Sequence, residues 1–192
     1  MREAVRNFIP KNRIWILTQL PAVVMGMMLT YNGSQWELLT PYSAYFAVSF
    51  LVLTLSLNPI KKLKPQWVWV LKLNRHRRQL GVASFSCALI HFVCFLIMRG
   101  SFYKAVPYFF HPAIIPGVWV AFPILLVLAI SSNNRSVKKL TFPKWKQLHR
   151  TVYLAEGVII VHMILMGEFV FALCFFVPLV GLQLLRFKNT PV

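Results

Sequence analysis

Histidines are the side chains of this sequence best suited to bind a metal. They are His76, His91, His111, His149 and His162. His91 lies 11 residues after Leu80, where an apolar segment begins, and His162 lies 11 residues after Thr151, where another begins. The two imidazoles are therefore expected at one depth on two helices. Imidazoles in that arrangement can hold the iron of a planar haem from opposite faces. The alternative interpretation is a pair of buried histidines that only make hydrogen bonds.

Further candidate ligands lie about 20 Å away along the same two helices. His149 precedes His162 by 13 residues, while Arg77 and His76 precede His91 by 14 and 15 residues. At about 100° per residue, 14 residues return to within about 40° of one helix face, whereas 13 residues miss it by about 140°. His149 is therefore expected in a bent helix start or just outside the regular helix. Two haem levels would form a path for electrons across the membrane.

The composition places these histidines in a membrane protein. Hydrophobic residues make up 58% of the chain, charged residues make up 13%, and the mean hydropathy is +0.63. A helix that crosses a bilayer needs about 20 mostly apolar residues. Six segments approach this requirement: 14–31, 41–58, 80–98, 113–131, 151–167 and 169–186. Because the alternating pattern of a membrane barrel is absent, we expect an all-α integral membrane protein whose residues 1–192 form one transmembrane domain. The last two segments require a tight turn at Gly167-Glu168.

The charged residues restrict both function and orientation. The chain has 21 Lys and Arg but only four acids, all Glu. With so few carboxylates, the chain cannot place them together as paired-carboxylate hydrolysis, magnesium-dependent phosphoryl transfer and calcium binding require, so these functions are excluded. All cations except Arg99 and Lys104 fall on one side of the six segments. The positive-inside rule then puts that side and both termini in the cytoplasm. The positive charge therefore indicates membrane topology and anionic lipid, and no nucleic-acid partner is expected.

Two motifs around the histidines resemble a known family. Arg77-Arg78-Gln79-Leu80-Gly81, followed by an apolar stretch to His91, resembles the third span of ferric-reductase-like transmembrane proteins. Trp145-Lys-Gln-Leu-His149-Arg150-Thr-Val-Tyr153, continuing to His162, is similar to their fifth span. Leu57-Asn-Pro-Ile-Lys-Lys-Leu63 also fits the branch of haem-binding subunits of bacterial methionine sulfoxide reductase systems, called MsrQ. The resemblance covers roughly residues 41–170.

The resemblance implies a six-helix cytochrome with one or two b haems in a bacterial inner membrane. It implies that His91 and His162 hold one haem and that His149 binds a second. Where related oxidases have another histidine on the third span, this chain has Arg77, which stays protonated and is a poor metal ligand. His76, Arg77 itself, or no residue would then complete the inner site. The cations at the inner level that could bind haem propionates are Arg77, Arg78, Lys146 and Arg150.

The resemblance also implies partners. Electrons would come from a cytoplasmic flavin reductase or from quinol, with FMN or a quinone at the cytoplasmic side, and would pass to a periplasmic oxidoreductase. The chain has no glycine-rich nucleotide motif and no room for a flavin domain. We therefore expect an electron-transfer subunit rather than a complete enzyme. Two alternatives stay open: a stand-alone transmembrane ferric or metalloreductase, and a non-redox transport or assembly subunit.

Overall fold

The computed structural model describes the backbone of residues 2–31 and 33–188 and the side chains of residues 13–31 and 34–185, and every regular element there is helical. The long helices are α1 (Arg2–Tyr31), α2 (Trp36–Leu63), α4 (Arg77–Met98), α9 (Val152–Leu165) and α10 (Phe169–Lys188). The shorter elements are η1 (Gly33–Gln35), α3 (Val68–Asn74), α5 (Phe102–Ala105), η2 (Val106–Phe110), η3 (Pro116–Ala121), α6 (Phe122–Ile130), α7 (Asn134–Leu140) and α8 (Phe142–Arg150). The expected all-α class is confirmed for the described chain.

Each of the six expected apolar segments forms helix. By length and composition, four helical stretches can cross a membrane: Arg13–Tyr31, Trp36–Leu63, Arg77–Met98 and Phe142–Leu165. A fifth candidate joins Pro116–Ile130 to Asn134–Leu140 through a bend of 97°. Phe169–Leu185 is apolar but shorter, about 26 Å long against about 30 Å of hydrocarbon. The described helices therefore include four or five candidate spans rather than six.

Helices also occupy much of the two long connections that separate the apolar segments. Within 59–79, α2 continues to Leu63 and α3 follows; within 132–150 lie α7 and α8. In α8, the side chains of Trp145, Leu148 and His149 are partly buried, whereas the other six are exposed. This one-sided pattern means that α8 packs against the rest of the bundle through one face.

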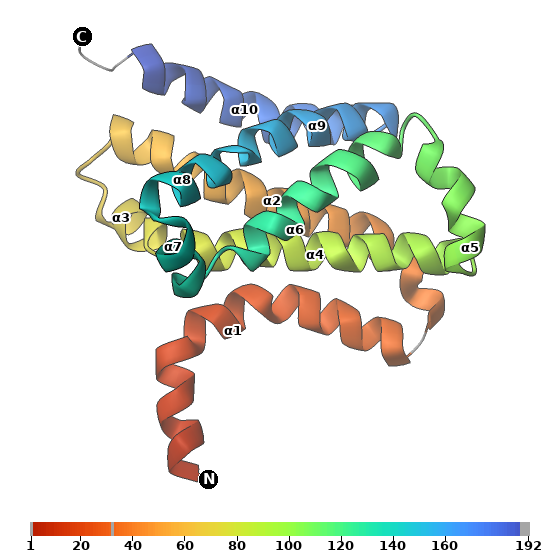
Figure 1. Cartoon of the computed structure of the whole chain (residues 1–192), viewed down its shortest axis with the longest axis horizontal. Coiled ribbons are helices and arrows are strands. Elements are labelled where there is room, and N and C mark those ends of the chain that lie inside the picture. Colours follow the sequence, from red (N-terminus) through yellow and green to blue (C-terminus); the bar gives the residue numbers. More distant parts are fainter. Residues whose placement is uncertain (1, 32, 189–192) are drawn as a thin grey trace.

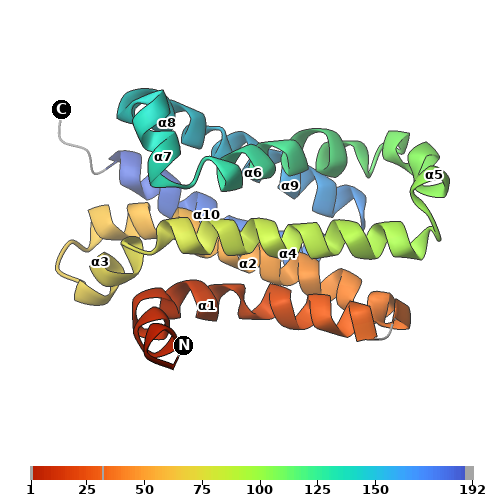
Figure 2. The same ribbon diagram turned by 60° about the horizontal axis from the view of Figure 1, so that its bottom comes forward.

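Helix α4, which carries His91, lies between α1 and α6 and runs along α2 (Figures 1 and 2). Small buried side chains let α2 and α4 approach closely, since packing in a membrane depends on van der Waals contact. They are Ser43, Ala47, Ala83 and Ser84. The Ser84 hydroxyl donates a 2.8 Å hydrogen bond to the Ala47 carbonyl, so a polar contact joins the two helices.

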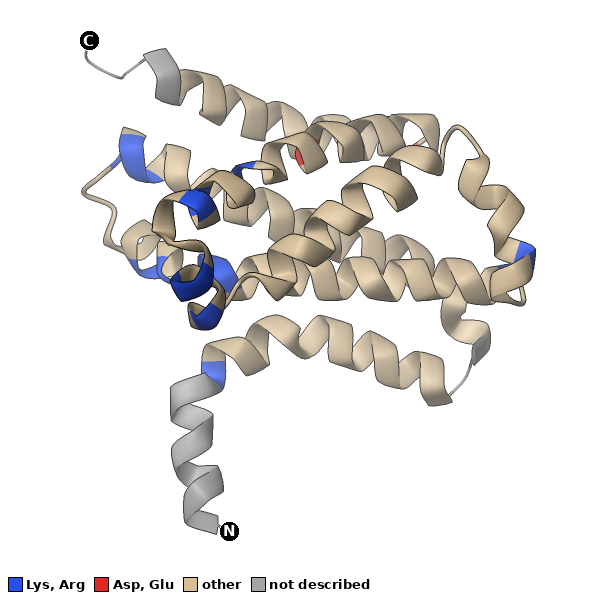
Figure 3. Ribbon diagram, in the orientation of Figure 1, with Lys and Arg blue, Asp and Glu red and all other residues tan. Residues whose placement is uncertain are grey.

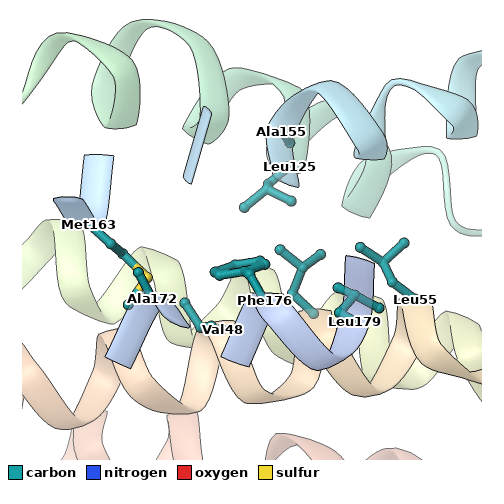
Figure 4. Packing of buried hydrophobic residues seen from close by; sticks show 9 residues of the cluster. Val48, Leu55, Leu125, Ala155, Met163, Ala172, Phe176 and Leu179 are labelled. Carbon is teal, nitrogen blue, oxygen red and sulfur yellow. The ribbon is translucent and has the colours of Figure 1, made fainter. Parts of the chain in front are cut away.

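Helix α9, which carries His162, is held by a separate apolar cluster with α2, α6 and α10. Figure 4 shows Leu55 of α2, Leu125 of α6, Met163 of α9 and Phe176 of α10 within this cluster. The expected turn between α9 and α10 is present: Gly167 has φ +85°, and the Glu168 amide donates to the Met163 carbonyl at 2.9 Å. A left-handed residue is least costly as glycine, which explains the reversal at this position.

The cations gather at one end of the helical bundle. Figure 3 shows most Lys and Arg segments near the junctions of α2 with α3 and of α7 with α8, with few at the α5 end. Arg99 and Lys104, the exceptions expected from the sequence, lie at the α5 end of α4. The side chains of Arg186 and Lys188, and of the cations before residue 13, lie outside the described set. Within that set, the sorting agrees with the expected charge asymmetry.

Candidate functional site

His91 of α4 is oriented by the backbone of α2. Its Nδ1 lies 2.9 Å from the Thr40 carbonyl oxygen, and its side chain is partly buried. A carbonyl oxygen can only accept, so Nδ1 carries the hydrogen and donates it. The other ring nitrogen, Nε2, is then the unprotonated one. His91 is therefore held in the tautomer that can bind a metal through Nε2.

His162 of α9 is oriented in the same way by a different segment. Its Nδ1 donates to the Ala113 carbonyl oxygen at 2.6 Å. The ring also lies against Gly117, in the π-helical turn η3: a β-carbon at Gly117 would be 3.2 Å from Cε1 and 3.3 Å from Nε2 of His162. Glycine at this position leaves room for the imidazole, and the carbonyl fixes its rotation.

The pairing of His91 with His162 stays a prediction, and the arrangement of the helices agrees with it. Helices α4 and α9 run in the same direction (Figure 1), and both contact α6. Among the described residues, no three His, Cys, Asp or Glu side chains gather around a point as a bare metal ion would require. Two imidazoles suffice for haem iron, whose other four ligands belong to the porphyrin. His91 and His162, which we call the outer pair, therefore fit a haem.

His149 lies in a different environment at the inner level. It belongs to α8, and the helix is interrupted at Thr151 before α9 begins, as the rotation argument required. Its Nε2 lies 3.1 Å from the Ser131 hydroxyl, and its ring packs against Trp145 at an interplanar angle of 31°, with 4.0 Å between ring centroids. The Trp145 indole in turn donates to the Ser131 carbonyl at 2.9 Å. His149 is therefore oriented through Nε2, whereas His91 and His162 are oriented through Nδ1.

The other inner candidates are directed to several partners. Arg77 donates through Nε to the Thr54 carbonyl of α2 at 3.2 Å. Arg78 donates to Asn134 Oδ1 at 2.6 Å and stacks over Trp145, with 5.3 Å from its Cζ to the ring centroid. Arg150 is exposed. Arg78 therefore contacts the Trp145–His149 pair, whereas Arg150 does not join these contacts.

His76 occupies the N-cap position of α4, and its side chain makes no capping hydrogen bond. Its buried Nδ1 has no hydrogen-bond partner, so no backbone carbonyl orients the ring as Thr40 orients His91. The inner level therefore presents one imidazole with Nε2 engaged, a second without an anchor, and an arginine that stays protonated. The inner residues are therefore not oriented like His91 and His162, and the number of haems, one or two, stays a prediction.

Four positioning residues were not identified from the sequence. Thr40 and Ala113 act through backbone carbonyls, which every residue has, so no side-chain pattern could reveal them. Ser131 lies at the end of α6 and looks like any helix-terminal serine. Gly117 did carry a signal, because it follows Pro116 inside an apolar segment, where a proline–glycine pair marks irregular backbone.

A family model described as ferric reductase like transmembrane component matches residues 40–164. This range starts at the residue whose carbonyl anchors His91 and contains both outer histidines. No solved structure matches the chain.

Relatives of two kinds are similar to the chain. The protein-methionine-sulfoxide reductase haem-binding subunit MsrQ of Herminiimonas arsenicoxydans is 36% identical over 131 residues, which cover 66% of this chain and 57% of the relative. MsrQ of Azospira oryzae is 29% identical, covering 79% of this chain and 66% of the relative. The magnetosome protein MamZ of Magnetospirillum gryphiswaldense is 28% identical, covering 79% of this chain and 23% of the relative. The chain thus spans less than two thirds of the length of each.

Proposed function

Because this chain belongs to the ferric reductase like transmembrane family, we propose that it is a b-type cytochrome subunit that carries electrons through a membrane. The supporting observation is the matched pair His91 and His162, each with Nδ1 fixed on a backbone carbonyl and Nε2 left to bind iron. A haem held there would accept and donate one electron at a time. The protein supplies the two axial nitrogens, their orientation and an apolar setting.

We propose one haem per chain, at the outer level. The names of the MsrQ relatives describe haem-binding subunits, which supports haem as the cofactor. The inner residues His149, His76 and Arg77 then serve the junction of α4, α6 and α8 rather than an iron atom. Arg78 and Arg150 contribute to the positive cytoplasmic end.

We propose six spans with both termini in the cytoplasm of a bacterial cell and the chain in the inner membrane. Successive long elements, from α1 through α2, α4, η3–α6, α8–α9 and α10, alternate in direction (Figure 1). The shorter sixth span is possible because a bilayer thins around a short helix at modest cost. The described cations at one end agree with this orientation.

We propose that electrons enter from a cytoplasmic flavin reductase or from quinol and leave to a periplasmic oxidoreductase, such as a methionine sulfoxide reductase. The positive cytoplasmic end would attract an acidic reductase. A quinol would instead arrive through the bilayer. The MsrQ relatives support the class of acceptor through their names.

Counting haem per chain tests this function directly. Protein expressed with haem supplied should show a Soret band and contain one haem per chain, and this ratio should be unchanged in His149→Ala and Arg77→Ala. A ratio of two that falls to one in His149→Ala would replace the single-haem assignment with two levels. The absence of any haem would reject the cytochrome and favour a non-redox membrane subunit.

The fit of His162 against Gly117 gives a second prediction. In Gly117→Ala the added methyl group would lie 3.2 Å from the imidazole, so the ring must shift relative to the Ala113 carbonyl. We expect haem affinity to fall by up to roughly 10-fold, the lower end of the loss that follows removal of an outer-shell partner. Gly157→Ala is the matched control, because a β-carbon at Gly157 meets nothing within 4 Å. Equal haem retention in the two variants would contradict the prediction; haem release into apomyoglobin measures it.

A further inference from the structure

Glu156 is a carboxylic acid buried in the middle of α9, and it is not one of the proposed haem ligands. Its side chain is 4% exposed. The Gln183 side chain of α10 donates through Nε2 to both carboxylate oxygens, at 3.0 Å each. An ionisable group at membrane depth is costly, and such residues usually carry a function.

No cation among the described side chains forms an ion pair or hydrogen bond with this carboxylate, as its partner is the neutral Gln183. The elements packed against α9 are α2, η3, α6, α8 and α10. Helix α2 has no titratable residue between Tyr45, near its outer end, and Lys61, near its last turn. η3 and α6 contain no titratable residue, and the described part of α10 contains only Cys174. The remaining titratable groups on α8 and α9 are Lys144, Lys146, His149, Arg150, Tyr153 and His162. Among the described side chains, Glu156 therefore has no permanent counter-charge.

The neutral partner suits either charge state of the acid. A Lys or Arg would hold the carboxylate ionised, whereas an amide offers both a donor and an acceptor. Gln183 can donate to the ionised carboxylate, as in this structure, or can accept from the protonated acid after its amide rotates. The pair is thus built to remain hydrogen-bonded whether or not a proton is present.

Glu156 also lies close to the outer haem ligand. It precedes His162 by six residues on the same helix, a rise of about 9 Å. Over such a distance in a low-dielectric interior, charges interact strongly. A ferric porphyrin with two neutral axial imidazoles has a net positive core, whereas the ferrous form has a neutral core. An electron arriving at this site therefore removes the positive charge that favours an ionised Glu156.

We propose that Glu156 binds a proton when the site formed by His91 and His162 gains an electron, and releases it when the electron leaves. The inference rests on the proposed haem function. One electron enters the iron, one proton from water joins a carboxylate oxygen of Glu156, and both are lost on reoxidation. The reductant is the electron donor of the proposed function, replaced in the test by a chemical reductant. Electron transfer through this chain is thereby coupled to a proton inside the membrane.

The midpoint potential of the haem, titrated spectroscopically at several pH values in the full chain, tests this coupling. Because reduction takes up a proton, the potential should fall as pH rises, by up to about 59 mV per tenfold change in proton concentration. Glu156→Gln keeps an oxygen that accepts from Gln183 but cannot titrate, so its potential should be nearly independent of pH. The matched control is Glu168→Gln, which removes an acid bonded to Tyr45 at the outer turn and should keep the wild-type slope.

A second measurement needs no variant that might misfold. The infrared difference spectrum between oxidised and reduced wild-type protein should show the carbonyl band of a newly protonated carboxylic acid. Equal slopes in wild type and Glu156→Gln, a pH-independent wild-type potential, or no such band would each overturn the inference while leaving the haem function intact. Protein that binds no haem at all would instead reject the proposed function on which the inference rests.

Discussion

Replacing either His91 or His162 by alanine should abolish stoichiometric haem binding. Each imidazole has its Nδ1 committed to a carbonyl, of Thr40 or Ala113, and offers a single nitrogen to iron. Removing that nitrogen takes away an axial ligand, so the loss should exceed the roughly 10- to 100-fold drop caused by removing an outer-shell partner. The haem-to-protein ratio of purified variants and the shape of their Soret bands measure the effect.

His111→Ala is the matched control for these variants. His111 is exposed at the outer end of the bundle, and its Nδ1 accepts a 3.3 Å hydrogen bond from the Ala113 amide. The substitution therefore removes a contact to the residue that orients His162 without removing a proposed ligand. It should retain the wild-type haem content. Equal loss in all three variants would indicate general destabilisation, and full retention in His91→Ala or His162→Ala would remove that residue from the ligand set.

The sequence predicted the outer pair because helical geometry is regular. A fixed rise per residue turns two equal spacings, Leu80 to His91 and Thr151 to His162, into one expected depth. The structure adds that α4 and α9 run in one direction with α6 in contact with both. It also adds the hydrogen bonds that select the tautomer, which depend on backbone carbonyls from distant segments and have no local sequence signal.

The inner level could be predicted only in part. The 13-residue spacing correctly required a break between His149 and the regular helix, and the interruption at Thr151 provides it. The contacts of His149 with Ser131 and Trp145 could not be predicted, because they depend on how α6 and α8 meet. The same limit applies to Glu156: it lies inside the apolar segment 151–167, but its partner Gln183 lies on another helix.

With the proposed single haem between His91 and His162, the identity of the donor decides how electrons reach the haem. A haem between His91 and His162 would lie roughly 20 Å from the level of His149. A water-soluble reductase docked on the positive end must transfer electrons over that distance, whereas a quinol can approach within the bilayer. Charge reversal at the cytoplasmic end separates the two donors, because only the soluble protein is steered by surface charge.

Changing Lys61, Lys62, Lys138 and Lys139 to Glu should slow haem reduction by an acidic cytoplasmic flavin reductase by roughly 10-fold or more at low salt. All four side chains are exposed, on α2 and α7. Surface charges steer a partner only within the screening length, so the rates of variant and wild type should converge as ionic strength rises. Stopped-flow absorbance of detergent-solubilised protein measures the rate without relying on membrane topology.

Two controls isolate the electrostatic effect. Lys104→Glu changes an exposed cation at the opposite end and should leave the rate with the reductase unchanged. A neutral quinol analogue should reduce the fourfold variant and wild type equally fast, since it has no charge to be steered. If the fourfold variant accepts electrons from the reductase at the wild-type rate at low salt, the positive end is not the docking surface. Fast reduction by the quinol analogue together with that result would identify a membrane carrier as the donor.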